Sequence, residues 1–253
     1  MTLPKLTGGG DYEILAVGAK KIGMSTVTQN ARRLNLPEEK LLGDWIVCIP
    51  GFTLDKYRRL QRSHLSIFSA HCFGGCMSKM LGLPFRSPFG TNGVESYGFI
   101  RFLREPHRYL EETLVYNGTA HNDITKKDFP LSKLGDILMT MMHYKNFEEF
   151  VAMWKRRKPR INWYNIFVEM CAEKVEILEQ FDALPYGKKV CFVPFKSDLD
   201  SAWYIDLEID KKVMPELKQS VRARIDKFGL GLIFYYDIFD MLLYGKKTPL
   251  IEM

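Results

Sequence analysis

The stretch Leu65-Ser66-Ile67-Phe68-Ser69-Ala70-His71-Cys72-Phe73-Gly74-Gly75 decides the fold of this 253-residue chain. Its first six residues form an uncharged, largely apolar run, which is the pattern of a buried strand. Paired glycines follow, and residues 77–81 beyond them are predicted to be helical. In open α/β sheets, ligands bind at the carboxyl ends of strands. We therefore expect the functional site of the protein at His71-Cys72-Phe73-Gly74-Gly75.

Two more strands are predicted before this stretch, at residues 12–17 and 44–49, with a helix at 25–34 between them. Strand, helix and strand within about 40 residues predict a right-handed parallel βαβ unit. Gly18 and Gly23 follow the first strand, where a dinucleotide-binding protein holds phosphate, but the full glycine pattern is absent. The turn therefore either binds phosphate or, as such remnants do more often, only packs.

The remainder of the chain alternates predicted helices and strands. Asn146, with Glu149 three residues later, predicts a capped helix start. The fold class indicated by this order is α/β, with a mostly parallel sheet flanked by helices in a three-layer, Rossmann-like arrangement and a helical C-terminal extension. We expect a Rossmann-like βαβ remnant at 1–60, packed on a main α/β domain at 61–253 that includes the C-terminal helices. Helices are predicted at 94–103, 109–114 and 163–181 and again after residue 198, and strands at 137–142 and 189–193.

The composition is that of a folded protein without a membrane span. Hydrophobic residues make up 46% of the chain, enough for a sizeable core. No apolar run reaches the roughly 18 residues of a membrane helix, and the N-terminus lacks the layout of a secretory signal, so we expect a cytoplasmic protein. The formal net charge of +6 suits an anionic ligand or peripheral association with an acidic membrane surface. Nucleic-acid binding is not expected, because the basic run 155–160 is short.

Five cysteines are scattered along the chain and give no disulfide framework. Cys48 and Cys191 lie in apolar runs and are interpreted as buried thiols in strands. Cys72 and Cys76 are four residues apart, but no second close pair of Cys or His residues completes a zinc pattern. No metal site is predicted, and no particular cofactor is indicated.

Cys72 is the candidate nucleophile, because a thiol between a strand and a helix N-terminus can be activated. His71 precedes it, but neighbours in an extended segment point to opposite faces, so adjacency does not make a catalytic pair. His143, at the end of another predicted strand, is the better candidate for a base or a phosphate ligand. Asp136 and Asp182 are further candidates for a base or metal ligand, although loop carboxylates more often form turns. The alternative for Cys72 and His143 is packing alone.

An anion site is predicted around the same turn. Paired glycines let backbone amides approach a ligand, and a helix N-terminus adds partial positive charge. Arginine is the preferred partner of phosphate and carboxylate groups. A nucleotide-sugar or an acyl-CoA would suit such a site, since both carry pyrophosphate. The residues predicted to bind substrate or phosphate are His71, Gly74, Gly75, Arg86, Ser87, Arg157, Arg160 and Asn162.

Three segments together carry a family resemblance: Ile67-Phe68-Ser69-Ala70-His71-Cys72-Phe73-Gly74-Gly75, Leu83-Pro84-Phe85-Arg86-Ser87-Pro88, and His143-Tyr144-Lys145 with the downstream runs 154–163 and 181–186. They resemble the bacterial family called domain of unknown function 1919, many members of which are labelled exopolysaccharide or capsule biosynthesis proteins. The resemblance covers residues 60–195. It departs from the family pattern at His71, where the pattern has Asn, and at Phe73, where it has Trp. It implies a cytoplasmic role in making or decorating surface glycans, without implying a particular reaction.

Three functions remain open on these observations. The first is a glycosyl- or acyltransferase that uses a phosphate-bearing donor on a polysaccharide precursor or lipid-linked glycan. The second is a hydrolase or acyl-carrying step that depends on Cys72. The third is a non-catalytic assembly factor, whose contact surface would be an exposed aromatic tail around Tyr235, Tyr236 and Phe239.

Overall fold

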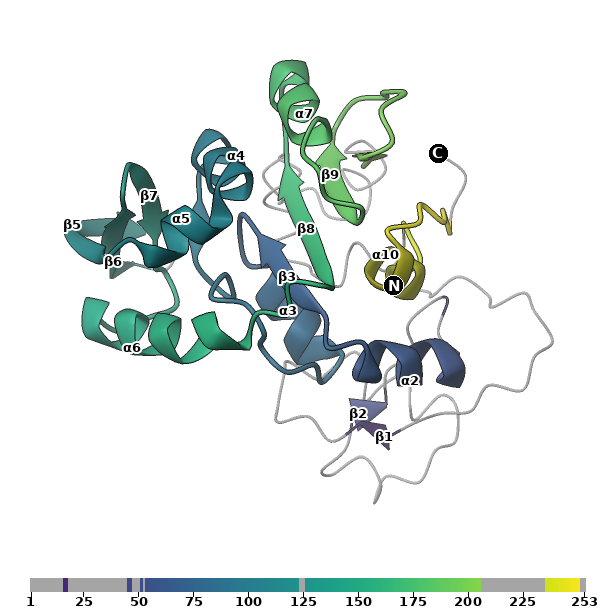
Figure 1. Cartoon of the computed structure of the whole chain (residues 1–253), viewed down its shortest axis with the longest axis horizontal. Helices are drawn as coiled ribbons and strands as arrows, with labels where there is room; N and C mark the ends of the chain where they lie inside the picture. The colour runs from purple at the N-terminus through teal and green to yellow at the C-terminus, as the bar shows by residue number, and fades with distance from the viewer. Residues whose placement is uncertain are drawn as a thin grey trace.

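The computed structural model describes residues 16–17, 45–46, 51, 53–122, 126–205 and 235–250. A four-stranded parallel sheet runs through the middle of this part of the chain, in the order β10-β9-β8-β3 (Figure 1). Its strands are β3 (Ser66–Ser69), β8 (Ile166–Cys171), β9 (Lys189–Val193) and β10 (Ala202–Tyr204). The strands predicted at 65–70 and 189–193 are confirmed.

A second four-stranded sheet is antiparallel and has the order β4-β7-β6-β5. Its strands are β4 (Gly93–Val94), β5 (Leu114–Asn122), β6 (Lys127–Leu134) and β7 (Ile137–Thr140). The sequence pattern predicts β7 but not β5, because β5 has no buried residue and so lacks the apolar face that marks a half-buried strand. The expectation of a mostly parallel sheet is thus corrected: the protein is α/β with one parallel and one antiparallel sheet. The Rossmann-like, three-layer arrangement stays a prediction.

Two hydrophobic cores lie on opposite faces of the parallel sheet, because successive side chains of a strand alternate in direction. On β8, Phe167 enters one core and Val168 the other. Helices α2 (Leu54–Arg62), α3 (Phe73–Met80) and α10 (Ile238–Tyr244) pack in the Phe167 core. The Val168 core contains α4 (Ser96–Arg104), α5 (Pro106–Glu111), α6 (Phe147–Arg157), α7 (Val175–Asp182) and the antiparallel sheet.

The helix predicted at 163–181 is wrong over its first half. Residues 166–171 form β8, and the helix that follows is α7. The run Ile166-Phe167-Val168 is rich in β-branched and aromatic side chains, which favour a strand. A strand buried on both faces shows no alternation, so periodicity alone does not separate it from a buried helix.

The predicted parallel βαβ unit is also corrected. The short strands β1 (Ala16–Val17) and β2 (Trp45–Ile46) pair antiparallel, whereas a βαβ crossover needs both strands to run in the same direction. The helix predicted at 25–34, the Gly18–Gly23 turn and Cys48 lie outside the described residues. The predicted boundary at residue 60 falls within α2, and the division into two domains stays a prediction.

The predicted cap of α6 is confirmed. The Asn146 side-chain oxygen accepts a hydrogen bond from the backbone amide of Glu149 at 2.9 Å. The Glu149 carboxylate in turn accepts one from the backbone amide of Lys145 at 2.8 Å. These reciprocal bonds satisfy amides that the first helical turn leaves without an intrahelical partner. The short helix η2 (Lys158–Arg160) continues directly from the end of α6.

The aromatic tail predicted to be exposed is buried instead. Tyr235 is 6% exposed, and Tyr236 and Phe239 are fully buried in the Phe167 core. The Tyr236 hydroxyl donates a hydrogen bond to the backbone carbonyl of Tyr204 at 2.7 Å. Large aromatic side chains bury enough apolar area to hold a segment against a sheet. These residues therefore fix α10 in the fold and do not offer a contact surface.

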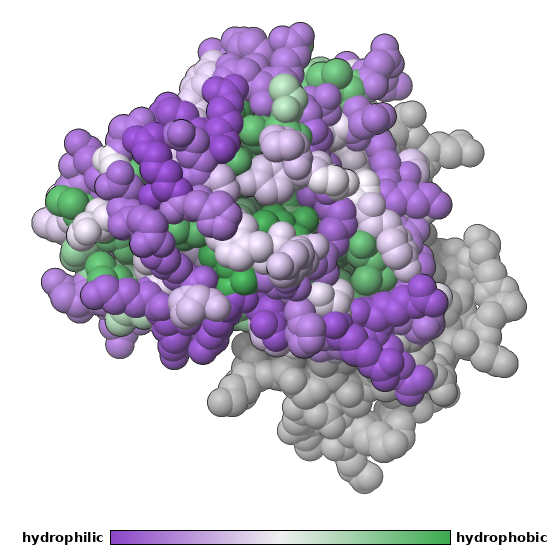
Figure 2. All heavy atoms as spheres, viewed as in Figure 1, coloured by the Kyte–Doolittle hydropathy of each residue, from purple (hydrophilic) through white to green (hydrophobic). Residues whose placement is uncertain are grey.

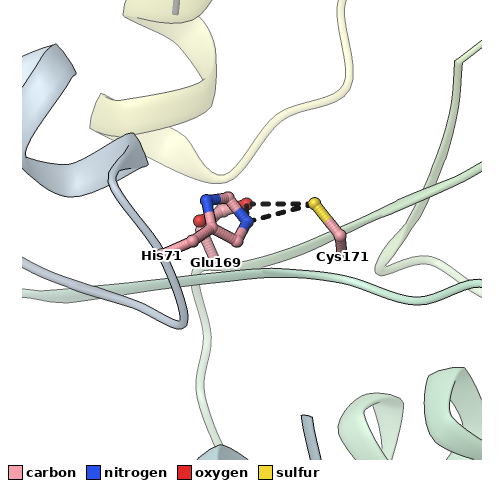
Figure 3. A group of neighbouring side chains, drawn as sticks. All are labelled: His71, Glu169 and Cys171. Carbon is pink, nitrogen blue, oxygen red and sulfur yellow. Dashed lines mark hydrogen bonds and ion pairs between the residues drawn. The ribbon is translucent and has the colours of Figure 1, made fainter. Parts of the chain in front are cut away.

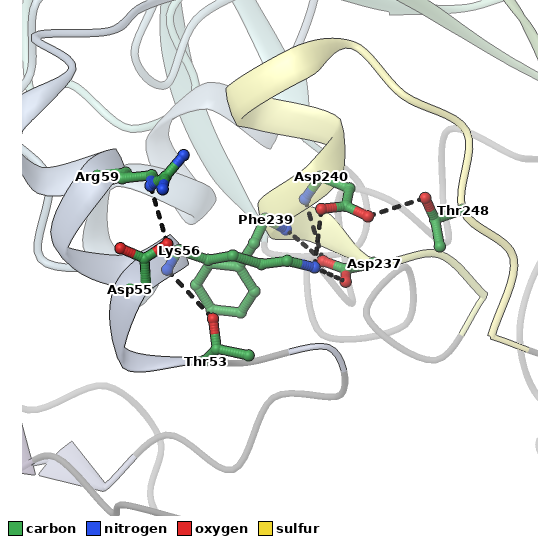
Figure 4. Close-up of polar contacts among 8 residues, drawn as sticks. All are labelled: Thr53, Asp55, Lys56, Arg59, Asp237, Phe239, Asp240 and Thr248. Carbon is green, nitrogen blue, oxygen red and sulfur yellow. Dashed lines mark hydrogen bonds and ion pairs between the residues drawn. The ribbon is translucent and has the colours of Figure 1, made fainter.

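An ion-pair network joins α10 to α2 (Figure 4). The Lys56 ammonium lies 2.7 Å from a carboxylate oxygen of Asp237 and 2.7 Å from one of Asp240. Asp237 also caps α10, accepting from the amides of Phe239 and Asp240. Gly51 stands before α2 at a φ of +80°, and a Cβ there would lie 2.2 Å from the Asp237 carboxylate. The absence of a side chain at Gly51 leaves the room that this carboxylate occupies.

The network shifts two pKa values in opposite directions. Burial alone would raise the pKa of Asp240, but hydrogen bonds from Lys56 and Thr248 hold it below the ordinary 3.8. Burial alone would lower the pKa of Lys56, but hydrogen bonds to Asp237 and Asp240 raise it above the ordinary 10.5. The Asp240 contribution to stability is therefore present above its unfolded pKa and lost as the pH falls through its folded pKa. The Lys56 contribution is present below its unfolded pKa and lost as the pH rises through its folded pKa.

Among the described residues, no helix is long and apolar enough to cross a membrane. Hydrophilic side chains cover most of the described surface on the face seen in Figure 2, and hydrophobic ones gather in smaller groups between them.

We expect Lys56→Met to lower the free energy of unfolding by roughly 2 kcal/mol at pH 7, because two largely buried carboxylates lose their counter-charge. This is less than the 3–5 kcal/mol of a fully buried pair, since the Lys56 side chain is 25% exposed. Urea unfolding of both proteins measures the difference. This difference in the free energy of unfolding should become smaller as the pH falls through the folded pKa of Asp240.

The matched control is Arg58→Met on the same helix, which removes an exposed positive charge that takes no part in the Lys56 network. We expect it to leave the unfolding midpoint nearly unchanged. An equal decrease in the free energy of unfolding for the two variants would contradict the stabilising role of the Lys56 network.

Candidate functional site

Cys72 and His143 form the first contact of the candidate site. Cys72 follows β3 and directly precedes α3, and its side chain is 7% exposed. His143 follows β7 and is exposed to solvent. The Cys72 Sγ lies 3.1 Å from the His143 Nε2. The structure thus brings the candidate nucleophile and the candidate base within contact distance, from two different sheets.

His71 has other partners, on a neighbouring strand (Figure 3). Its Nε2 lies 3.0 Å from a carboxylate oxygen of Glu169 and 3.1 Å from the Sγ of Cys171. His71 is 3% exposed, and Glu169 is fully buried. His71 and Cys72 therefore make separate contacts, as expected from the alternation of neighbours in an extended segment. The two His–Cys contacts come from consecutive residues of one turn.

The two glycines of the turn serve close packing. Gly74 and Gly75 lie within the first turn of α3, which begins at Phe73, four residues earlier than predicted. The Gly74 amide donates to the Ser69 hydroxyl at 3.0 Å. A Cβ on Gly75 would lie 2.1 Å from the backbone carbonyl oxygen of Gly90. The approach of α3 to the loop at residues 89–91 thus gives these glycines a packing role, and their part in binding an anion stays a prediction.

Arg157 packs against the same loop at Gly90. Its guanidinium stacks over the Phe85 ring at 4.5 Å and donates to the Tyr144 hydroxyl at 3.2 Å. A Cβ on Gly90 would lie 2.5 Å from an Arg157 nitrogen, so the missing side chain makes room for the guanidinium. Arg157 is only 7% exposed and makes no ion pair with any carboxylate in the described part of the chain. A buried positive charge is costly without a compensating anion.

Three other predicted anion ligands have structural partners. The guanidinium of Arg86 lies 2.9 Å from the His64 ring nitrogen. The buried Ser87 hydroxyl accepts from the Phe89 amide, which forms a turn. Asn162 donates from its side chain to the backbone carbonyl of His64 and accepts from the amide of Tyr164. These contacts shape the loops around β3, so Ser87 and Asn162 have a structural role that the sequence pattern does not reveal.

The remaining predicted residues lie apart from the Cys72–His143 contact. Arg160 is exposed in η2. Asp136 lies in the β6–β7 turn, where it accepts from the Tyr109 hydroxyl at 2.8 Å and pairs with Arg101 at 3.0 Å. The hydrogen bond from Tyr109 is the main cause of the lowered pKa of Asp136. Asp136 thus joins the antiparallel sheet to helices α4 and α5 and does not contact Cys72 or His143.

The sequence pattern does not predict Glu169 and Cys171 as site residues, because it predicts one helix over residues 163–181. The signal that could have found them is a single carboxylate inside the apolar run Ile166-Phe167-Val168-Glu169-Met170-Cys171. An acidic residue in a strand that is otherwise buried needs a specific partner, so it is a candidate functional residue. Cys191 was correctly predicted as a buried strand thiol, and burial raises its pKa well above the ordinary value.

A groove of about 400 Å³ lies beside the His143 segment. It is bordered by β5, β6 and the start of α6, and Tyr116, Phe129, Lys145 and Phe147 are among its lining residues. The Tyr116 and Phe147 rings pack against each other at its edge, with their centroids 5.7 Å apart. Aromatic side chains next to Lys145 and the acidic residues Asp128 and Glu148 are suited to an amphipathic ligand.

We expect Gly75→Ala to destabilise the protein by about 2 kcal/mol, because the new methyl group would collide with the backbone of Gly90 and force α3 away from it. The control is Gly187→Ala, since a Cβ at Gly187 would meet no atom within 4 Å. Urea unfolding at pH 7 compares the two. If Gly75→Ala unfolds at the wild-type midpoint, the close approach of α3 to the loop is not required.

Comparison with known proteins places the chain in a family. Residues 47–231 match the family described as "Domain of unknown function (DUF1919)". A protein of Haemophilus influenzae (strain ATCC 51907 / DSM 11121 / KW20 / Rd), described as an uncharacterized protein, is 30% identical over 154 residues, which are 58% of this chain and 71% of the relative. The family match spans every strand of both four-stranded sheets. The resemblance seen in the sequence is confirmed, and the chain belongs to the DUF1919 family.

Proposed function

We propose that the protein is a thiol-dependent acyltransferase, in which Cys72 is the nucleophile and His143 the general base. The observation that carries the proposal is the distance of 3.1 Å between Cys72 Sγ and His143 Nε2, at the carboxyl end of a parallel strand and ahead of a helix. A thiol beside an imidazole is the arrangement of covalent acyl transfer. Glycosyl transfer, the alternative transferase reaction, would not use the Cys72 thiol as a nucleophile in this way.

The proposed reaction has two balanced steps. The Cys72 sulfur attacks the carbonyl carbon of an acyl thioester while His143 takes the thiol proton. The C–S bond of the donor then breaks, and the leaving thiol takes the proton from His143. In the second step an acceptor hydroxyl attacks the acyl-Cys72 thioester, His143 takes its proton, and the Cys72 thiol is restored. If water replaces the acceptor, the same residues catalyse hydrolysis.

An acyl-CoA is the donor that we propose. Its thioester matches the chemistry of Cys72, and its phosphates supply the negative charge that the buried Arg157 guanidinium lacks among the described residues. Gly90 links the two parts of the site, since it lies against both Gly75 of α3 and Arg157. For the acceptor, the resemblance noted in the sequence supports a hydroxyl of a surface-polysaccharide precursor or lipid-linked glycan, modified in the cytoplasm. The groove lined by Tyr116 and Phe147 is where we place it.

Binding without catalysis is the second candidate. The aromatic surface predicted for an assembly factor is buried, so nothing among Tyr235, Tyr236 and Phe239 supports that version. The groove lined by Tyr116 and Phe147 would be its binding surface instead.

We expect purified protein incubated with acetyl-CoA to gain one acetyl group on Cys72, detected by intact-mass and peptide mass spectrometry. Cys72→Ser should abolish the thioester, and His143→Ala should slow its formation by about 10²–10⁴-fold. The matched controls are Cys76→Ser, which removes a thiol one helical turn away, and His121→Ala, which removes an exposed histidine of the β5–β6 pair. Acetylation of Cys76 at the same rate as Cys72 would contradict the proposal.

We expect Arg157→Met to weaken CoA binding at least about tenfold, because the charge is lost while the stacked side-chain volume is kept. Isothermal titration with CoA measures the dissociation constant. Arg160→Met, on the exposed η2 segment, should bind CoA as the wild type does. Unchanged binding by Arg157→Met would exclude Arg157 as the phosphate partner.

A further inference from the structure

We propose that His71, Glu169 and Cys171 form a binding site for a divalent transition metal, for which zinc is the best fit. The three potential ligand atoms all lie within 4.8 Å of one another. The separations are 3.0 Å from His71 Nε2 to the Glu169 oxygen, 3.1 Å from Nε2 to Cys171 Sγ, and 3.9 Å from that sulfur to that oxygen. Zinc bond lengths of about 2.0–2.3 Å at tetrahedral angles put ligand atoms about 3.3–3.6 Å apart. The cluster is close to that geometry.

The sheet itself brings these side chains together. Ser69 of β3 pairs with Glu169 of β8, and the Ala70 amide donates to the Glu169 carbonyl at 3.1 Å. Continuing the parallel register by two residues puts His71 opposite Cys171. Glu169 and Cys171 are two residues apart on one strand, so their side chains share a face of the sheet. The three ligands thus come from two hydrogen-bonded strands, which are rigid supports for a metal site.

The geometry differs from that of a catalytic triad. In a Cys-His-acid triad the two ring nitrogens of histidine contact different partners, one the nucleophile and the other the acid. Here the carboxylate and the thiol both approach the same nitrogen, Nε2 of His71 (Figure 3). One nitrogen carries at most one proton and donates it along one direction. A metal ion between the three atoms would contact all of them at once.

Charge and donor chemistry favour the same assignment. A divalent cation bound by one carboxylate, one thiolate and one neutral imidazole has a formal charge of zero, which suits a cluster in which His71 is 3% exposed and Glu169 is fully buried. Imidazole, thiolate and carboxylate are all zinc ligands, and the thiolate disfavours magnesium and calcium. Three protein ligands leave a fourth position for water or a substrate oxygen, as in reactive zinc sites. Cys171 is partly exposed, so the cluster is open on its side.

The test uses the full chain, expressed without a histidine tag in zinc-supplemented medium and purified without chelators. Elemental analysis should find about one zinc per chain. Removing the zinc with a chelator and adding Co²⁺ should produce the thiolate-to-cobalt charge-transfer absorption in the near ultraviolet. His71→Ala, Glu169→Gln and Cys171→Ser should each lower the affinity at least about tenfold. Cys171→Ser should also remove the charge-transfer band.

Cys76→Ser is the matched control and should keep both the zinc and the cobalt band. Cys72→Ser should keep the metal while losing the acyl-enzyme, so failure of the metal site and failure of the acyltransferase are told apart. Less than about 0.1 zinc per chain, together with no charge-transfer band after cobalt addition to the wild type, would overturn the proposal. A Cys171→Ser variant that keeps the band would also overturn it. The wild-type cobalt spectrum decides the question even if a variant fails to fold.

Discussion

The parallel pairing of β3 with β8 is the constraint on which the rest of the structure depends. Ser69 pairs with Glu169, and this register sets the positions of the residues that follow β3. It puts His71 beside Glu169 and Cys171, and it leaves Cys72 to meet His143 from the antiparallel sheet. A slip of one residue would turn each side chain of β3 to the opposite face and exchange the partners of the two hydrophobic cores. The same register therefore fixes both the packing and the candidate chemistry.

Two chemically similar contacts lie side by side but in different environments. The Cys72–His143 contact joins a buried thiol to an exposed imidazole, so a proton can pass between the site and solvent. The His71 cluster is mostly buried, and its polar atoms converge on one another. The first arrangement suits a reaction in which a proton is taken up and released. The second suits a bound metal ion, since three ligand atoms converge on one point, and we therefore assign the two contacts different roles.

The sequence predicts those parts of the fold whose signals are local. The strand before His71, the strand at 189–193 and the cap formed by Asn146 and Glu149 all follow from residues close in sequence. Cys72 and His143 could be proposed individually, but their contact spans 71 residues and depends on how two sheets meet. The sequence does not predict β8, because a strand buried on both faces shows no alternation of apolar and polar residues. Glu169 and Cys171 lie in this strand and are therefore not predicted either. The sequence predicts an anion site at the glycines but not their packing role, since no local signal shows that Gly90 approaches Gly75.

The ion pair between Lys56 and Asp237 spans 181 residues, and it has a consequence for how the chain is made. During synthesis, α2, α3 and one face of the parallel sheet emerge long before α10, which supplies Phe239 and Leu242 to their shared core. Until the ribosome has released that helix, the face carrying Phe167 and Phe192 lacks part of its cover. Transiently exposed apolar surface of this kind makes a folding intermediate prone to aggregation. α10 thus completes the cover of a core whose other parts are made earlier.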